Sequence, residues 1–300
     1  MDLETLLERN YDELKDPWCK EEVLHYLYQN DSVKDKDALF VKRLTKVASH
    51  ILQSEDSIET CILERLFYFN QEGARKIREG EIGEIKLNQF SLMKMEAHFY
   101  GHAGKVAEAI FKRTGIIAWG GVSYSSFMLA AKKNNDFESG YTCMSYSIAG
   151  DVAQDIFKKT GNIEWAKNAY EAKINAAKSV ELFDPKHSAY EYGFAGEIAM
   201  EMFKSTKDVK LGEKAYYDYM KAADMIKELD QKHSAHCYGF AGDIAKRLFK
   251  RTKEKEWAQK AIDCYKQFDD FYRFYSPAIK RRLRKRVKSN IDQLGRQIKV

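Results

Sequence analysis

Two histidines four residues apart have the best spacing in this sequence for metal chemistry. His98 and His102 would lie on one face of a helix, where two imidazoles can share a metal ion. The same positions 46 residues later hold Met144 and Ile148, and aromatic residues occupy them again further along the chain. We therefore expect packed or groove-facing histidines here, and no metal site.

A second pair of histidines is separated by the same 46 residues. His187 and His233 are each followed by a serine, which indicates hydrogen bonding at the start of a helix. The sequence contains no H-E-x-x-H, P-loop, G-x-S-x-G or paired-cysteine motif. It therefore predicts neither an enzyme nor a bound cofactor.

The strongest charge feature is a basic run near the C-terminus. Seven of the nine residues in 280–288 are basic: Lys280, Arg281, Arg282, Arg284, Lys285, Arg286 and Lys288. The last 30 residues carry a net charge of +9 whereas the whole chain carries +5, so the remainder is mildly acidic. Such a run could bind nucleic-acid phosphates, an anionic membrane surface or an acidic protein. Alternatively, the basic run could be only the solvent-exposed face of a terminal capping helix.

Composition limits the class of protein. Apolar residues make up 44% of the 300 residues, enough for a core, and the three prolines favour helices. No apolar run reaches the 18 residues of a membrane span. Five scattered cysteines without a CxxC pair, and an acidic start without a signal core, predict a reduced, cytoplasmic protein.

A repeat of 46 residues positions the histidines discussed above. A tyrosine followed three residues later by Ala-Gly recurs without insertion, beginning at Tyr100, Tyr146, Tyr192 and Tyr238. Further columns hold alanine, phenylalanine, lysine and threonine in the same register. Identical columns in four copies indicate a structural repeat.

Each repeat is predicted to form two helices. In the third copy, Asp184-Pro185 would start a helix over 186–205, and a second helix would run from Val209 to Leu229. Glycine inside a helix costs roughly 1 kcal/mol relative to alanine. Its recurrence predicts a close approach of paired helices, with the aromatic columns in the core. Neither helix can bury its apolar face alone, so stacked hairpins are expected to form a solenoid.

The repeat resembles a known family. Tyr192-x2-Ala195-Gly196 resembles the first half of the tetratricopeptide signature, W-x2-L-G-x2-Y, and Ala215-x3-Tyr219 resembles the second half. The unit is longer than the family's 34 residues and lacks its closing proline, and its length also falls in the HEAT and armadillo range. The resemblance implies an all-α, right-handed solenoid of antiparallel helix hairpins.

Three regions are expected. Residues 1–91 would be N-terminal helices, as a cap or as degenerate repeats; 92–275 would hold the four repeats; and 276–300 would form a basic amphipathic capping helix. Within the first region the apolar spacing predicts helices at about 3–14, 17–27, 37–53 and 57–79, and a further helix from about 85.

The resemblance also implies a partner groove lined by the first helices of the repeats. The matching positions are Asp151, Asp155, Tyr190, Glu197, Glu201, His236, Asp243 and Arg247. Chaperone-binding members of the family use Lys, Asn and Arg there to clamp a carboxylate, and the acids here argue against such a clamp. We expect an acidic groove for a basic or apolar peptide, or for the protein's own basic tail. The predicted function is a non-catalytic intracellular scaffold or adaptor; the alternative is RNA or nucleic-acid binding through the C-terminal helix.

Overall fold

A computed structural model describes part of the chain. The described residues are 23, 26–27, 29, 36, 40–45, 60–81, 88–135, 138–270 and 277–299. Every regular element among them is an α-helix. The helices expected at about 3–14, 17–27 and 37–53 lie largely outside the described residues. The chain divides into two compact units, Met1–Ile156 and Phe157–Val300, and each is described by itself.

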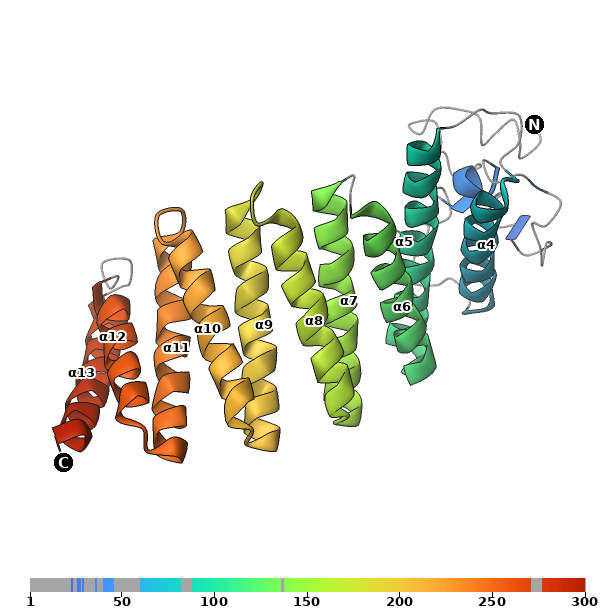
Figure 1. Ribbon diagram of the computed structural model, residues 1–300. Helices are drawn as coiled ribbons and strands as arrows, with labels where there is room; N and C mark the ends of the chain where they lie inside the picture. Colours follow the sequence, from blue (N-terminus) through green and yellow to red (C-terminus); the bar gives the residue numbers. More distant parts are fainter. Residues whose placement is uncertain are drawn as a thin grey trace. The chain divides into compact units, whose positions relative to one another are not determined.

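Unit 1 consists of helices that pack in chain order. It contains α4 (Thr60–Glu79), α5 (Gln89–Thr114), α6 (Ile117–Asn134) and most of α7 (Ser139–Thr160). α4 packs against α5, and α5 packs against α6 (Figure 1). Ile156 of α7 lies next to Gly120 of α6. α5 begins at Gln89 and not at about 85, because the Asn88 side chain accepts a hydrogen bond from the Ser91 amide and fixes the helix start there.

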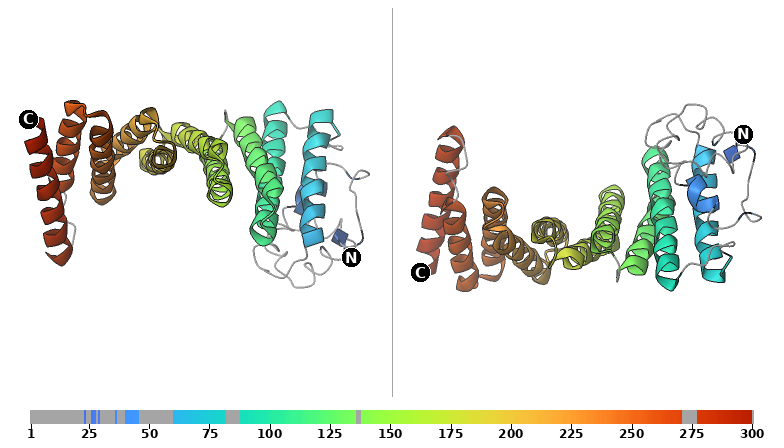
Figure 2. Two further views of the ribbon diagram at one scale, coloured as in Figure 1. Left: turned by 90° about the horizontal axis from the view of Figure 1, so that it is seen from below. Right: turned by 90° about the horizontal axis from the view of Figure 1, so that it is seen from above.

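Unit 2 is also built from helices that pack in chain order. Its helices are α8 (Ile163–Val180), α9 (Pro185–Thr206), α10 (Val209–Ile226), α11 (Gln231–Thr252), α12 (Lys255–Asp270) and α13 (Pro277–Lys299). Each packs against the next, and the two views of Figure 2 show the same order. This succession is an all-α solenoid, as predicted. Among the described residues, no helix combines the length and apolar character needed to cross a bilayer.

The predicted helix boundaries rest on local capping. The Asp184 side chain accepts from the His187 amide, and Pro185 follows it in the first turn of α9. Asn162 caps α8 by accepting from the Glu164 amide. α10 ends at Ile226, three residues before the predicted Leu229, because the chain must turn to place Asp230 as the cap of α11.

The glycine column allows the two helices of a hairpin to approach closely. A Cβ atom on Gly196 would lie 2.9 Å from the Tyr219 ring, and one on Gly242 would lie 2.9 Å from the Tyr265 ring. Real Cβ atoms essentially never come this close, so any side chain there would push the helices apart. The predicted role of this column is therefore confirmed. The tyrosine column is buried in the core, as predicted: Tyr192, for example, is 3% exposed.

Candidate functional site

The first helices of the third and fourth repeats, α9 and α11, share a set of surface positions that we call the first-helix face. It is formed by Tyr190, Phe194, Glu197 and Glu201 on α9 and by His236, Phe240, Asp243 and Arg247 on α11. The structure thus brings six of the predicted groove residues onto two helices of unit 2. Asp151 and Asp155 are exposed on α7.

Two aromatic rings are the main apolar feature of this face. Phe194 is 49% exposed and Phe240 is 52% exposed, and they lie one repeat apart. The Lys173 ammonium lies 5.0 Å from the centroid of the Phe194 ring. The Tyr219 ring packs against Phe240 with their centroids 5.2 Å apart. Each exposed ring is therefore held by a buried side chain, which fixes its position.

The N-terminal end of the face is held by hydrogen bonds. The Tyr190 hydroxyl donates to Asp230 Oδ2 at 3.0 Å, and its ring packs edge-on against His233 with centroids 4.5 Å apart. Burial lowers the pKa of both His233 and His236, which favours the neutral form of each imidazole. Both residues contribute ring surface and hydrogen-bonding groups to this end of the face.

The serines beside His187 and His233 act as predicted. Ser188 donates to the Ala177 carbonyl at 2.8 Å, and Ser234 donates to the Ala223 carbonyl at 2.9 Å. Each bond ties the start of a first helix to the end of the second helix before it. These residues are structural.

The predicted acidic character of the groove is reduced by the chain itself. Asp243 accepts from the Tyr265 hydroxyl at 2.7 Å and from Arg286 Nη2 at 2.6 Å. One carboxylate of the groove is thus neutralised by one arginine of the basic run. Binding of the basic tail in the acidic groove stays a prediction, since this pair is one contact between α13 and α11, and Glu197 remains exposed.

The basic run lies on α13, which covers the last hairpin. Among its seven basic residues, those with described side chains are all exposed: Arg284, Lys285, Arg286 and Lys288. The side chains of Lys280, Arg281 and Arg282 lie outside the described residues. Lys246 of α11 donates to Asn290 at 2.8 Å and to Gln293 at 3.2 Å. Together with the packing of α13 on α12, these contacts fit a capping helix.

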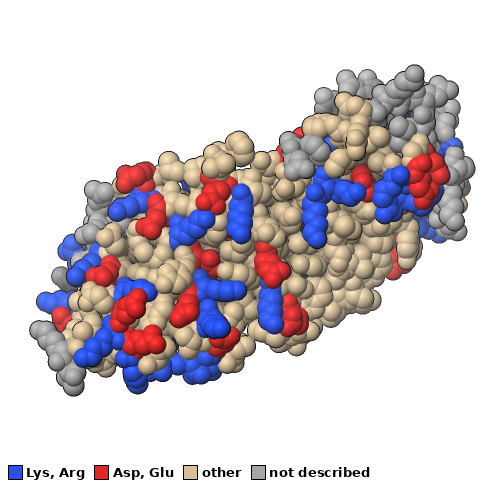
Figure 3. Space-filling view, viewed as in Figure 1, with Lys and Arg blue, Asp and Glu red and all other residues tan. Residues whose placement is uncertain are grey.

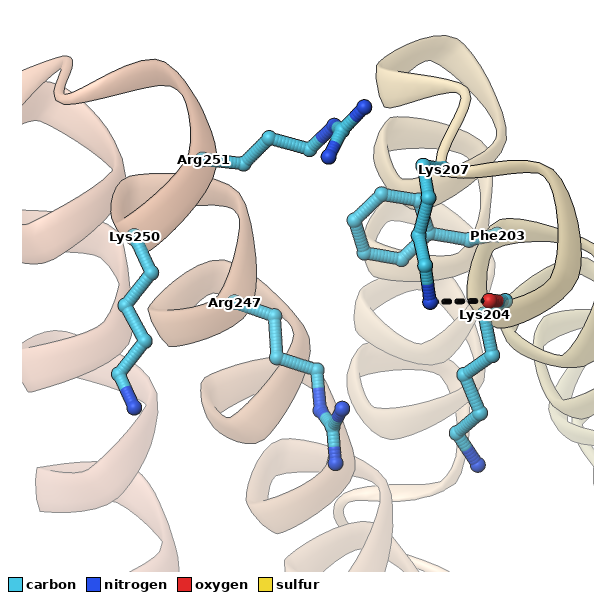
Figure 4. A pocket seen from close by; sticks show the side chains of 6 residues that line it. All are labelled: Phe203, Lys204, Lys207, Arg247, Lys250 and Arg251. Carbon is cyan, nitrogen blue, oxygen red and sulfur yellow. Dashed lines mark hydrogen bonds between the residues drawn. The ribbon is translucent and has the colours of Figure 1, made fainter.

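Arg247 of the first-helix face also lies among other basic residues. It lines a hollow of about 440 Å³ together with Phe203, Lys204, Lys207, Lys250 and Arg251 (Figure 4). Sequence reasoning missed this hollow. The lysine column that contains Lys204 and Lys250 was visible as a repeat feature, but it was not connected with Arg247.

Of the pair His98 and His102 in unit 1, His98 packs against an aromatic ring. The His98 ring lies 4.9 Å from the Tyr141 ring, and burial is the main cause that lowers its pKa. Across the described part of the chain, no group of three or more His, Cys, Asp or Glu residues is arranged to hold a metal ion.

Comparisons with known proteins add little about function. No protein-family model matches the sequence, and the comparison with curated proteins gives no match. BtubC (BKLC) from P. vanneervenii is 15% identical, with 90% of this chain and 94% of that chain covered and a TM-score of 0.45. The S. pombe nuclear import adaptor Nro1 is 10% identical, with 91% and 88% covered and a TM-score of 0.46. The designed helical repeat protein DHR64 is 14% identical, with 89% and 97% covered and a TM-score of 0.24. At these values the similarity carries no functional conclusion.

Proposed function

We propose that this protein is a non-catalytic scaffold or adaptor that binds a peptide or protein segment on the first-helix face of unit 2. The observation that carries the proposal is the exposed pair Phe194 and Phe240, which occupy the same position of successive repeats. Large exposed aromatic residues rimmed by polar groups are typical of protein interaction sites.

The surroundings of these rings define the chemistry of the partner. Lys173 and Tyr219 hold the rings in place, so binding would cost little side-chain ordering. Glu197 is exposed one turn after Phe194 and offers a carboxylate to a basic residue. A segment that combines apolar and basic side chains therefore fits this face best.

The residues of the face support binding over catalysis. Their side chains are aromatic, acidic or basic, and they include no serine, threonine or cysteine nucleophile beside a general base. His236 is exposed, and desolvation by its neighbours lowers its pKa.

The proposal is tested by affinity capture with matched variants. Full-length protein and the double variant Phe194→Ala/Phe240→Ala are immobilised, and proteins captured from a cell lysate are quantified. The control variant is Phe183→Ala/Leu229→Ala, which also removes two exposed apolar side chains one repeat apart, from the turns before α9 and α11. We expect partners to be lost from the first variant and retained by the control, and recovered partners to bind the purified protein directly.

A nuclease-treated half of the same lysate separates the two functions that the sequence allows. Partners that persist after treatment agree with the first-helix face. Retention of all partners by Phe194→Ala/Phe240→Ala would contradict the proposal. Capture that depends on nucleic acid would instead favour the basic α13.

A further inference from the structure

The hollow that contains Arg247, which we call the cationic hollow, gathers five positive charges from two helices. Lys204 lies in the last turn of α9 and Lys207 follows that helix, whereas Arg247, Lys250 and Arg251 belong to α11. Figure 4 shows the Arg251 side chain extending from α11 toward Lys207. The buried ring of Phe203 completes the lining, so the hollow joins one apolar surface to five cations.

These charges lack the acidic partners found elsewhere in unit 2. Lys221 pairs with Glu181 and Lys260 pairs with Glu256, and Figure 3 shows acidic and basic residues interspersed on the visible surface. Within the described ranges, no carboxylate oxygen lies within 4.0 Å of any of the five cations of the hollow. Lys207 donates only to the backbone carbonyl of Lys204. Five like charges around one cavity repel each other unless an anion enters it.

Helix stabilisation explains only some of these residues. Cations in the last turn of a helix interact favourably with its dipole. This applies to Lys204, Lys250 and Arg251. Lys207, the C-cap of α9, donates to the Lys204 carbonyl and is explained in the same way. Arg247 lies before the last turn of α11, and the helix end does not account for it.

Lys207 and Arg247 differ from the residues that some or all of the other copies hold at the same positions. The positions equivalent to Lys207 in the first two copies are Gly115 and Gly161, both with positive φ. Lys207 adopts the same left-handed conformation, with φ of 63°, although a side chain disfavours it. The other copies hold Ala109, Asp155 or Glu201 where this one has Arg247. Arg247 is therefore specific to the fourth copy, whereas Lys207 has a counterpart in Lys253, and both Arg247 and Lys207 bring positive charge to the same hollow.

We propose that the cationic hollow binds a compact anion carrying two or more clustered phosphate groups. Five cations exceed the charge of a single phosphate, and about 440 Å³ is within the range of pockets for small ligands. The two arginines can each bind phosphate oxygens in a bidentate manner, and the lysines add point charges. This activity goes beyond partner binding on the first-helix face, and it does not depend on the exposed phenylalanines.

Calorimetric titration of the full-length protein with tripolyphosphate tests the site. We expect one binding site per chain, with orthophosphate at least tenfold weaker. Arg247→Gln/Lys250→Gln should lower tripolyphosphate affinity at least tenfold. Lys227→Gln/Lys232→Gln makes the same change in net charge near the other end of α11 and should change affinity less than twofold. Equal losses in both variants, or no binding by the unchanged protein, would overturn the proposal.

A second pair of variants separates the site from protein stability. Lys207 and Lys253 have the same place in successive repeats and nearly the same φ, 63° and 64°, but only Lys207 lines the hollow. Lys207→Gly and Lys253→Gly should shift the melting temperature alike, since both relieve the same conformation. Only Lys207→Gly should weaken tripolyphosphate binding, by threefold or more. An equal effect of the two on binding would contradict the assignment.

Vesicles distinguish a free phosphate compound from a lipid headgroup. The protein is sedimented with phosphatidylcholine vesicles containing phosphatidylinositol bisphosphate, with and without tripolyphosphate. Sedimentation that tripolyphosphate displaces, and that Arg247→Gln/Lys250→Gln abolishes, assigns the phosphates to a headgroup. Tripolyphosphate binding without such sedimentation assigns them to a free compound. If Arg247→Gln/Lys250→Gln sediments as much as the unchanged protein, the vesicles bind another surface. If, in addition, the unchanged protein does not bind tripolyphosphate, the proposed site is refuted.

Discussion

Two successive helix interfaces of unit 2 fill the same repeat positions with different chemistry. Where α8 meets α9, Lys173 lies against Glu191; one repeat later, where α10 meets α11, the equivalent residues are Tyr219 and Cys237. Lys173 Nζ is 3.3 Å from Glu191 Oε2, and these side chains are 2% and 4% exposed. The first interface therefore buries an ion pair where the second buries an aromatic ring.

The difference shows what the repeat requires at this column. Lys173 contacts the Phe194 ring as Tyr219 contacts the Phe240 ring, so both residues fill space beneath an exposed aromatic side chain. At both interfaces this position requires a side chain large enough to fill the space beneath the ring. The interface of α8 with α9 also buries a charge, whose desolvation cost the aromatic interface avoids.

Removal of one member of the ion pair should have the largest effect. Lys173→Ala leaves the buried Glu191 carboxylate without its cation, and we expect a loss of about 3–5 kcal/mol in the free energy of unfolding. Urea unfolding followed by circular dichroism measures this loss. Tyr219→Ala serves as the control for the lost volume alone. A loss below about 1 kcal/mol for Lys173→Ala would show that the carboxylate is not held by this lysine.

Replacement of both residues of the ion pair should not lower the free energy of unfolding, in contrast to the removal of Lys173 alone. Lys173→Tyr/Glu191→Cys installs the residues of the next repeat at the same positions. Buried ion pairs replaced by well-packed groups often give a gain of about 1–4 kcal/mol, and we expect a stability at least equal to that of the unchanged protein. The same urea experiment checks this. A double variant less stable than Lys173→Ala would show that the two interfaces differ in shape as well as in charge.

The repeat could be predicted from the sequence because its signals are local or periodic. Capping by Asp184 and Asn162 depends on residues two or three positions away, and the glycine column is visible in four copies. The Lys173–Glu191 pair could not be predicted, because it joins two helices at positions where the copies differ.

The candidate site was predictable only in part, for the same reason. The family resemblance located the first-helix face, but the pairing of Asp243 with Arg286 joins residues 43 positions apart. The cationic hollow likewise combines the ends of two helices in different repeats. Such clusters depend on how one hairpin stacks on the next, and single columns do not encode that.

A second contrast, between equivalent residue pairs of α8 with α10 and of α10 with α12, is testable through pH. Tyr170 forms a hydrogen bond with Asp218, whereas one repeat later Tyr216 faces Cys264. Burial raises the pKa of Asp218 from 3.8 to about 6. Because the folded state holds this proton more tightly than the unfolded state, Asp218 contributes stability below about pH 4 that is lost as pH rises through 6.

We expect the free energy of unfolding of the unchanged protein to include a decrease on the order of 2 kcal/mol between pH 4 and pH 7 that is due to Asp218. Asp218→Asn should lack this decrease. Urea titrations at several pH values compare this variant with Asp263→Asn, which changes an exposed carboxylate. A pH dependence that is unchanged in Asp218→Asn would show that this carboxyl keeps its ordinary pKa.

The smallest expected effects separate close packing from helix propensity at one interface. A Cβ atom on Gly196 would lie 2.9 Å from the Tyr219 ring, so Gly196→Ala should cost about 1–3 kcal/mol by overpacking. Three residues earlier in α9, a Cβ atom on Gly193 would have its nearest neighbour, His233 Nε2, at 3.8 Å, which is ordinary contact. Gly193→Ala should therefore stabilise the protein by about 0.5–1 kcal/mol, because alanine loses less conformational entropy in a helix. Urea midpoints of the two variants should move in opposite directions. If both urea midpoints fell, α11 would have to approach α9 at Gly193 as closely as the Tyr219 ring approaches Gly196. The packing would then be tight between neighbouring hairpins (α9 with α11) as well as within one hairpin (α9 with α10).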